Sequence, residues 1–199
     1  AQRFPASSSA SQRLCARIQY TVEAACKLKE RNMAKTIQLD QGSGGRAMHE
    51  LVSELFVSAF ANEYLLELND SALVQMEAGS MAMTTDSYVV DPVVFPCGDI
   101  GSLAVHGTVN DLAMRGARPL YLTAGFILEE GLPFDLLEQI VTSMGAAARA
   151  AGVLIVAGDT KVVPRGKADK LFINTAGVGV VPPGLRIGGQ YARPGDAIL

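Results

Sequence analysis

Residues 153–161 read VLIVAGDTK, five apolar residues that run directly into a Gly-Asp-Thr-Lys turn. A short uncharged run that ends at a glycine is typical of a buried strand. We therefore expect a strand over 153–157 that stops at Gly158 and Asp159, with Lys161 just beyond it. On an extended segment Asp159 and Lys161 point to the same side, because side chains alternate along a strand.

Outward from this strand, helical and strand patterns alternate along the chain. In residues 51–60 apolar side chains recur at spacings of three and four, which indicates an amphipathic helix. Glycines after residues 115 and 151 are typical ends of two further helices. We expect helices at 51–60, 102–115 and 134–151, strands at 36–39, 72–75, 81–90, 120–128 and 171–181, and a loop at 91–99. The alternation predicts a mixed α/β (α+β) domain.

The charge of the chain argues against a nucleic-acid surface. Residues 1–32 carry six bases and two acids, which leaves 11 bases and 18 acids on the rest of the 199 residues. An acidic body of this kind is a poor partner for a phosphate backbone. No uncharged apolar run approaches the length of a membrane span. The three cysteines form no CxxC pair, which favours a reducing, cytoplasmic location.

The chain divides into three segments by composition. Residues 1–32 are acid-poor and rich in Ser and Arg, as in an organellar transit peptide or an extension ahead of Met33. The compact pattern that starts at Met33 favours the extension, which we expect to be disordered. Residues 33–181 form the main domain. After Pro182 and Pro183, residues 182–199 begin a new element inside an apolar run, so we expect the start of a truncated second domain and a fragment of a longer protein.

Four acidic residues lie at or near the ends of apolar elements, where an unpaired buried carboxylate costs several kcal/mol. They are Asp70, Asp86, Asp111 and Asp159. Carboxylates gathered from separate elements point to a cation, and with oxygen ligands alone to magnesium, which binds one or two carboxylates together with substrate phosphates. Lys161 would then stabilise charge on a phosphate. The sequence therefore predicts a Mg²⁺–nucleotide site without a P-loop.

A glycine-rich stretch, Gly42, Ser43, Gly44 and Gly45, precedes the first expected helix. Glycines allow the backbone to approach an anion, and free N–H groups follow at the start of the helix. The stretch matches neither GxxxxGK[ST] nor GxGxxG. Two interpretations stay open at this point, a flexible turn and a ligand contact.

Several blocks together resemble the HypE family of hydrogenase maturation proteins, within the aminoimidazole-ribonucleotide-synthetase-like superfamily. The resemblance covers residues 37–199 and implies a mixed sheet with helices on one face. It also implies a homodimer, in which these domains pair sheet to sheet, and Mg²⁺–ATP bound near that interface. The blocks that carry it are Gly42–Gly45, Thr84–Val90, Gly98–Gly101, Gly107–Met114, Ala124–Gly131, Gly158–Val163 and Ile173–Gly177.

The resemblance implies an activity and its residues. HypE-type proteins use ATP to dehydrate a carboxamide on their own C-terminal cysteine to a thiocyanate, with a HypF-like carbamoyltransferase upstream and the HypC–HypD complex downstream. Lys161 and Asp86 would take catalytic roles. The implied metal ligands are Asp70, Asp86, Asp111 and Asp159, with Asp70 the weaker match, and the implied nucleotide contacts are Gly42, Ser43, Gly44, Gly45, Asn110, Asp111, Thr160 and Lys161.

Three departures from the family pattern matter. Asn69 and Asp70 stand where the family usually has an acidic pair, which makes Asp70 the weaker match. Cys97 stands where the family pattern has glycine, and no cysteine lies at the end of the chain, so we expect the chain alone to be inactive in the dehydration. Two alternatives remain. Another enzyme of the superfamily, such as a selenophosphate synthetase, a thiamin-phosphate kinase or the purine enzyme itself, would share the fold, although the reactive Cys expected early in a selenophosphate synthetase is absent from the Gly42–Gly45 region. The second alternative is a non-catalytic dimeric docking module.

Overall fold

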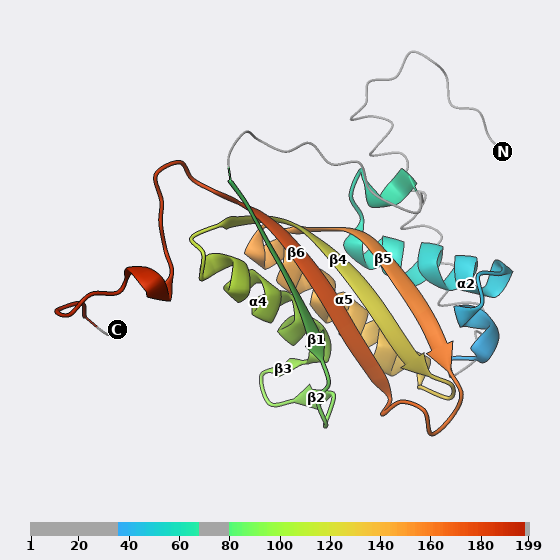
Figure 1. Ribbon diagram of the computed structural model, residues 1–199. Coiled ribbons are helices and arrows are strands. Elements are labelled where there is room, and N and C mark those ends of the chain that lie inside the picture. The colour runs from blue at the N-terminus through green and yellow to red at the C-terminus, as the bar shows by residue number, and fades with distance from the viewer. Residues whose placement is uncertain (1–35, 68–79, 198–199) are drawn as a thin grey trace, which may run out of the picture.

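The computed structural model describes residues 36–67 and 80–197. A four-stranded sheet with the order β1-β6-β4-β5 forms its centre (Figure 1). β4 (Arg118–Glu129) is parallel to β5 (Leu154–Val163) and antiparallel to β6 (Leu171–Val181), which is antiparallel to β1 (Ser80–Tyr88). The expected mixed sheet is therefore confirmed.

Helices α4 (Ile100–Ala113) and α5 (Phe134–Ala151) lie together behind one face of this sheet (Figure 1). Burial alternates along the strands, with Leu122 and Leu128 of β4 fully buried toward the helices. α5 buries one apolar stripe, which includes Leu137 and Ile140, against the sheet. The prediction of helices on one face is confirmed.

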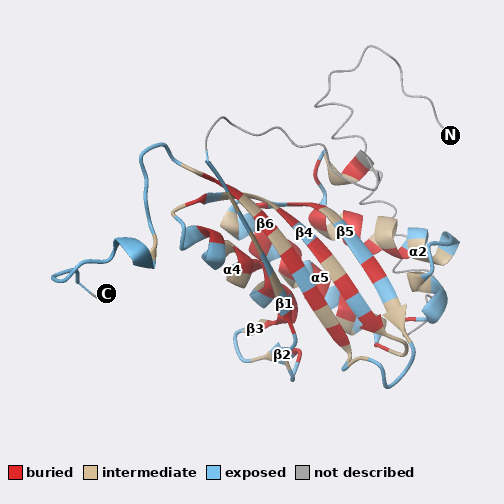
Figure 2. Ribbon diagram, viewed as in Figure 1, coloured by how far each residue is buried: buried red, intermediate tan, exposed pale blue. Residues whose placement is uncertain are grey.

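The opposite face of the sheet is uncovered by any described helix (Figure 2). Large apolar side chains lie on it: Met83 and Val89 on or just after β1 are 68% and 70% exposed, and Met81 and Ile127 are exposed as well. We call this surface the open face. Exposed apolar area of this extent on one side of a sheet is typical of an interaction surface.

A helical segment runs beside the β5 edge of the sheet. It comprises a short 3₁₀ helix, η1 (Leu39–Gly42), then α2 (Arg46–Leu51), a π-helical turn η2 (Val52–Phe56) and α3 (Val57–Phe60). Asn62, which is buried, donates from Nδ2 to the Ile155 carbonyl at 2.8 Å and fixes the far end of this segment to β5. A further 3₁₀ turn, η3 (Leu65–Glu67), follows.

Most predicted elements are confirmed, and three predictions are wrong. β5 continues to Val163, so Asp159 lies inside a strand and does not end one. The expected loop at 91–99 contains a small hairpin of β2 (Val94–Phe95) and β3 (Gly98–Asp99). The expected strand at 36–39 is only an isolated bridge between Thr36 and Pro133, followed by η1. After β6, a last 3₁₀ turn, η4, spans Gly189–Tyr191.

Some predictions fall outside the described residues. They are the extension at 1–32, the strand at 72–75 and Asp70. In the described part of the chain, no helix is both long enough and apolar enough to cross a membrane.

Candidate functional site

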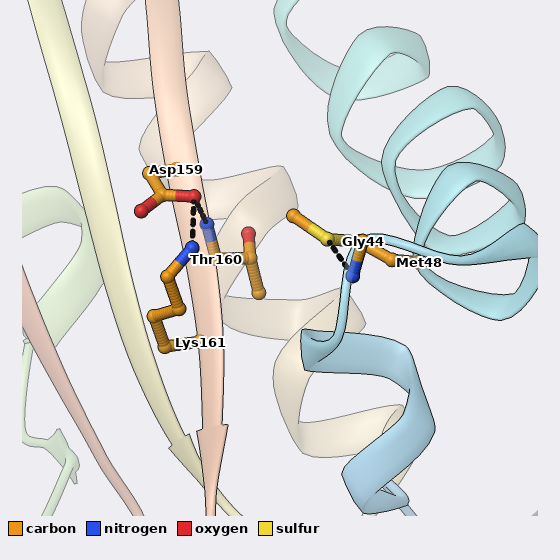
Figure 3. A network of polar contacts seen from close by, with 5 residues as sticks. All are labelled: Gly44, Met48, Asp159, Thr160 and Lys161. Atoms are coloured by element: carbon orange, nitrogen blue, oxygen red, sulfur yellow. Dashed lines mark hydrogen bonds and ion pairs between the residues drawn. The ribbon is translucent and has the colours of Figure 1, made fainter.

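Asp159, Thr160 and Lys161 lie in the middle of the edge strand β5. Asp159 Oδ1 accepts the Thr160 N–H and the Lys161 ammonium, both at 2.9 Å (Figure 3). Asp159 pairs in register with Gly125, so its side chain and that of Lys161 belong to the open face. Both are largely exposed, at 62% and 60%, while Thr160 is buried on the other side. The prediction that the two charged groups share a side is confirmed.

The glycine-rich loop Gly42–Gly45 lies beside this part of β5. Gly42 packs on Val162 so tightly that a Cβ on Gly42 would come within 2.9 Å of the Val162 Cβ. Gly44 has φ +82, a conformation that favours glycine, and its N–H points at the Met48 sulfur, 3.2 Å away (Figure 3). A thioether is a weak acceptor, so a stronger acceptor would readily replace it. We call the loop together with Asp159, Thr160 and Lys161 the β5 site.

A small apolar cavity of about 70 Å³, partly open to solvent, adjoins the β5 site. Phe56 and Phe126, whose ring centroids are 4.8 Å apart, form part of its wall, and Asp159 and Thr160 line it on the β5 side. Met48, whose sulfur accepts from the Gly44 N–H, lines it too, so the cavity lies between the glycine-rich loop and Asp159. Nothing in the sequence had singled out Met48, because one methionine in an amphipathic helix is indistinguishable from a core residue.

The other predicted residues lie on the far edge of the sheet, between β1 and α4. The Thr84 hydroxyl donates to Asp111 Oδ2 at 3.0 Å, which joins the strand to the helix. Asp86 follows two residues later on the same side of β1, and its Oδ1 accepts the Ser87 N–H at 2.8 Å. Asn110 and Asp111 are both exposed on α4. We call Asp86, Asn110 and Asp111 the β1–α4 site.

The two sites lie apart within one copy of the chain. β6 and β4 separate β1 from β5, and three strand spacings place Asp86 roughly 14 Å from the Asp159 strand. Asp86 faces the α4 side, whereas Asp159 faces the open side. Among residues 36–67 and 80–197, no three His, Cys, Asp or Glu side chains come close enough to hold a metal together.

This arrangement fits one kind of magnesium site only. A metal held mainly by protein ligands does not fit, since neither site supplies three carboxylates in the described residues. A magnesium ion that takes one or two carboxylates and otherwise binds phosphate and water does fit. Asp159 on one edge, or Asp86 and Asp111 on the other, would supply those carboxylates. Their assignment as ligands remains a prediction.

A buried hydroxyl network stands behind Asp86, and the sequence had not indicated it. Tyr88 and Thr108 hydroxyls lie 3.2 Å apart, Thr108 and Thr175 hydroxyls 2.5 Å apart, and Thr175 donates to the Ala104 carbonyl at 3.3 Å. Burial raises the pKa of Tyr88, the hydrogen bond with Thr108 lowers it, and the nearby Asp86 carboxylate raises it. The sequence feature that could have predicted this network is the presence of threonines at inward-facing positions of β6 and α4.

Asn174 is a second residue that carried no predicted role. Its Nδ2 donates to the Asp86 carbonyl and to the Ser87 hydroxyl, both at 2.9 Å, so it fixes the backbone of β1 at Asp86. It belongs to the open-face row that runs from Ser87 through Asn174 and Gly125 to Asp159. These four residues are register partners on adjacent strands, so the strand pairing connects the backbone next to Asp86 with the backbone at Asp159.

Comparison with known proteins agrees with this geometry. The family model described as AIR synthase related protein, N-terminal domain, matches residues 68–181, more than half of the chain. The chain belongs to this AIR synthase related family. Its resemblance to HypE is also confirmed: carbamoyl dehydratase HypE of Azotobacter vinelandii is 60% identical over 164 residues, which are 82% of this chain and 48% of that protein.

Two solved structures extend the comparison within the AIR synthase related family. A hydrogenase maturation protein HypE in complex with ATP matches with a TM-score of 0.79 and 61% identity, over 80% of this chain and 48% of that one. HypE in a HypE–HypF complex matches with a TM-score of 0.58 and 54% identity, over 73% of this chain and 47% of that one. The chain spans about half the length of the relatives it matches.

Proposed function

We propose that this chain is the ATP-binding and dimerisation part of a HypE-type carbamoyl dehydratase. One observation carries the proposal: Gly42 packs on β5 at Val162, the residue after Lys161, so the glycine-rich loop adjoins the stretch of β5 that carries a carboxylate and an ammonium. The same fold at 61% identity holds ATP in a solved relative, which supports nucleotide binding at a site of this family.

The β5 site suits phosphate chemistry. The Lys161 ammonium is paired with Asp159 on an exposed surface, and such a pair contributes little stability, so Lys161 can turn toward a phosphate at small cost. The Gly44 N–H, which now faces a thioether, can donate to a phosphate oxygen. Asp159 would hold the Mg²⁺ that accompanies ATP, and the positive charge of the metal would offset negative charge on the phosphates.

The proposed reaction removes the elements of water from a thiocarbamate. The carboxamide oxygen takes the γ-phosphoryl group of ATP, which converts a poor leaving group into a good one. Loss of two amide protons and of phosphate then yields a thiocyanate, ADP and inorganic phosphate. Lys161 would stabilise the transferring phosphoryl group, and Asp86 would serve as the second catalytic residue. The thiocyanate would supply cyanide for [NiFe]-hydrogenase iron.

The partners follow from the same proposal. The open face, with Met83 and Val89 exposed, supports a sheet-to-sheet homodimer, and the position of Asp159 on that face supports an ATP site beside the dimer interface. A HypF-like carbamoyltransferase is the proposed donor, supported by the HypE–HypF complex of a relative. The proposed acceptor is a HypC–HypD complex, and the proposed location is the cytoplasm. We expect the 199 residues alone to bind nucleotide without completing the dehydration.

Isothermal titration of the chain with ATP, in Mg²⁺ and in EDTA, tests the nucleotide site. We expect Mg²⁺-dependent binding that Asp159→Asn weakens by more than tenfold, about 1.4 kcal/mol. Asp169→Asn, at an exposed carboxylate in the β5–β6 loop, is the matched control and should bind as the parent does. Equal affinity of parent and Asp159→Asn would remove Asp159 from the site. A chain that forms dimers but gives no heat of nucleotide binding in the titration would favour a non-catalytic dimeric docking module instead.

A further inference from the structure

Gly125, in the middle of β4, is a glycine that packing inside the chain does not require. A Cβ on Gly125 would meet nothing closer than the Asn174 carbonyl oxygen, at 3.8 Å, which is ordinary van der Waals contact. Its φ lies outside the left-handed region, so backbone freedom does not require a glycine either. At the other glycines of the four-stranded sheet a Cβ would come within 2.7 Å of another atom; these are Gly158, Gly177 and Gly179. Gly125 alone of this set leaves out a side chain for which there is room.

A glycine in the interior of a strand weakens the strand, so its presence needs a reason, and a common one is the close approach of a ligand or of another backbone. Gly125 belongs to the open face, where its neighbours along β4, Thr123 and Ile127, are exposed. The missing side chain therefore leaves a gap in the side-chain layer of the open face. We call this place the Gly125 gap.

Polar groups border the Gly125 gap on both neighbouring strands. Asn174 of β6 and Asp159 of β5 are the register partners of Gly125, so their side chains flank it. They lie two strand spacings apart, which is roughly 10 Å. The Lys161 ammonium is 2.9 Å from Asp159 Oδ1. The gap therefore has an amide group on one side and a carboxylate with an ammonium on the other.

Hydrogen bonds to β1 fix the orientation of the Asn174 amide. Its Nδ2 donates to the Asp86 carbonyl and to the Ser87 hydroxyl, both at 2.9 Å. A carbonyl oxygen can only accept, so the amide nitrogen is the atom that faces β1, and Oδ1 lies on the side away from these two groups. No residue of 36–67 or 80–197 donates to Oδ1. Asn174 thus offers a ligand one hydrogen-bond acceptor at the border of the Gly125 gap.

We propose that the Gly125 gap holds the carboxamide that is dehydrated, with Asn174 as the specificity-determining residue for its NH₂ group. The inference rests on the proposed function, which places the phosphates of ATP at Lys161. The carboxamide donates its N–H to Asn174 Oδ1 and turns its oxygen toward Lys161, where the γ-phosphoryl group is transferred. A hydrogen bond of about 2.9 Å on one side and an attack distance of about 3–3.5 Å on the other leave space for one planar amide in the roughly 10 Å between the two flanking strands. Asn174 is neutral, so it orients the amide and removes no proton.

A small polar ligand fits this place better than a second copy of the chain does. The exposed apolar side chains of β1 on the open face, Met83 and the adjoining Val89, suit contact with another sheet. The row through Gly125 instead presents amide, carboxylate and ammonium groups. A carboxamide has both the N–H donor that Asn174 Oδ1 needs and the oxygen that takes the phosphoryl group, whereas an ester has no such donor.

The test measures binding of N-acetyl-S-carbamoylcysteine, a soluble thiocarbamate, to the chain with Mg²⁺–ADP bound, by ligand-observed NMR. A second probe, in which a methoxy group replaces the NH₂ group, lacks the N–H donors. We expect the parent to bind the carbamoyl probe roughly tenfold more tightly than the methoxy probe. Gly125→Ala should weaken binding of the carbamoyl probe roughly tenfold or more, because the added methyl group occupies the gap. Its affinity for Mg²⁺–ATP, measured by titration calorimetry, should equal that of the parent.

Gly189→Ala is the matched control. Gly189 lies in η4, outside the sheet, and a Cβ there meets no atom within 4 Å, so this variant should bind both probes as the parent does. The melting temperature of Gly125→Ala should not fall, because alanine weakens a strand less than glycine does. A loss of probe binding in Gly125→Ala therefore cannot come from a loss of stability.

Three results would overturn the inference while the nucleotide site stands. In the first, the parent binds Mg²⁺–ATP but does not bind the carbamoyl probe or does not distinguish it from the methoxy probe. In the second, Gly125→Ala binds the carbamoyl probe as the parent does. In the third, Gly125→Ala weakens dimerisation in analytical ultracentrifugation, which would make a second copy the group that approaches Gly125. A parent chain that binds no Mg²⁺–ATP would instead remove the proposed function, and the inference with it.

Discussion

Gly42 lies against the backbone of Val162, with no space between the glycine-rich loop and strand β5 for even one methyl group. A Cβ on Gly42 would overlap the Val162 nitrogen and come within 2.9 Å of the Val162 Cβ and Cγ2. The contact joins two stretches of sequence that lie 120 residues apart (162 − 42). It brings the glycine-rich loop to the part of β5 that carries Asp159 and Lys161, and so the β5 site depends on it.

Gly42→Ala should therefore move the loop away from β5. Overpacking of this kind costs about 1–3 kcal/mol, and we expect a loss of stability in that range together with weaker Mg²⁺–ATP binding. Urea denaturation and titration calorimetry measure the two effects. Gly45→Ala is the control, because a Cβ there meets no atom within 4 Å and φ is −86, so both properties should stay near those of the parent. Similar losses in both variants would contradict a specific role for the Gly42 contact.

Lys161→Met should separate a phosphate contact from an ordinary surface ion pair. Loss of the exposed pair with Asp159 costs at most about 1 kcal/mol of stability, so the melting temperature should hardly change. Loss of a charge-assisted hydrogen bond to phosphate costs about 1.5–3 kcal/mol, so ATP affinity should fall tenfold or more in a titration. Lys167→Met removes a similar charge from the exposed β5–β6 loop. If both variants lose affinity equally, only general electrostatic attraction is at work.

The sequence predicted the elements that local pattern controls. The helix at 134–151 and the strand at 171–181 were predicted to the residue. Apolar periodicity and a terminal glycine define the helix, and turn residues bound the strand. The end of β5 was missed. Gly158 and Asp159 normally interrupt strands, yet pairing with β4 carries the strand on to Val163. Tertiary pairing outweighed local preference there.

The site was predicted in part for a similar reason. The pairing of Asp159 with Lys161 could be predicted, because residues two apart on any strand point to the same side. That the glycine-rich loop would join them, and that Asp86 and Asp111 would lie at the opposite edge, depends on the strand order β1-β6-β4-β5, which no local pattern encodes. The hydroxyl network of Tyr88, Thr108 and Thr175 was missed because its members come from three elements.

Cys97 adopts the conformation that glycine would favour at this turn. Its φ is +71, in the left-handed region, between β2 and β3. That conformation costs a residue with a Cβ about 1–2 kcal/mol, from which the extra flexibility of an unfolded glycine subtracts about 0.5–1 kcal/mol. Cys97→Gly should thus raise stability by roughly 0.5–1 kcal/mol in urea denaturation. Cys97→Ala retains the Cβ and should give no such gain; equal gains in both would assign the effect to the thiol.

The ion pair between Lys170 and Asp91 should make stability depend on pH at the alkaline end. Nζ of Lys170 lies 2.7 Å from Asp91 Oδ1, and this hydrogen bond raises the pKa of Lys170 above its ordinary 10.5. The folded state then binds more protons than the unfolded state above pH 10.5, so stability falls as the pH rises through the raised value. Below pH 10.5 the contribution is fully present.

Lys170→Met isolates this contribution, because it removes the charge and keeps the apolar stem and the left-handed backbone of Lys170 (φ +65). Urea midpoints measured at pH 8 and again above pH 11 should differ between parent and variant only at the lower pH, with the parent more stable. High salt should shrink the difference at pH 8, since both side chains are substantially exposed. A difference that persists unchanged above pH 11 would mean that packing of the Lys170 stem, and not its charge, stabilises the contact.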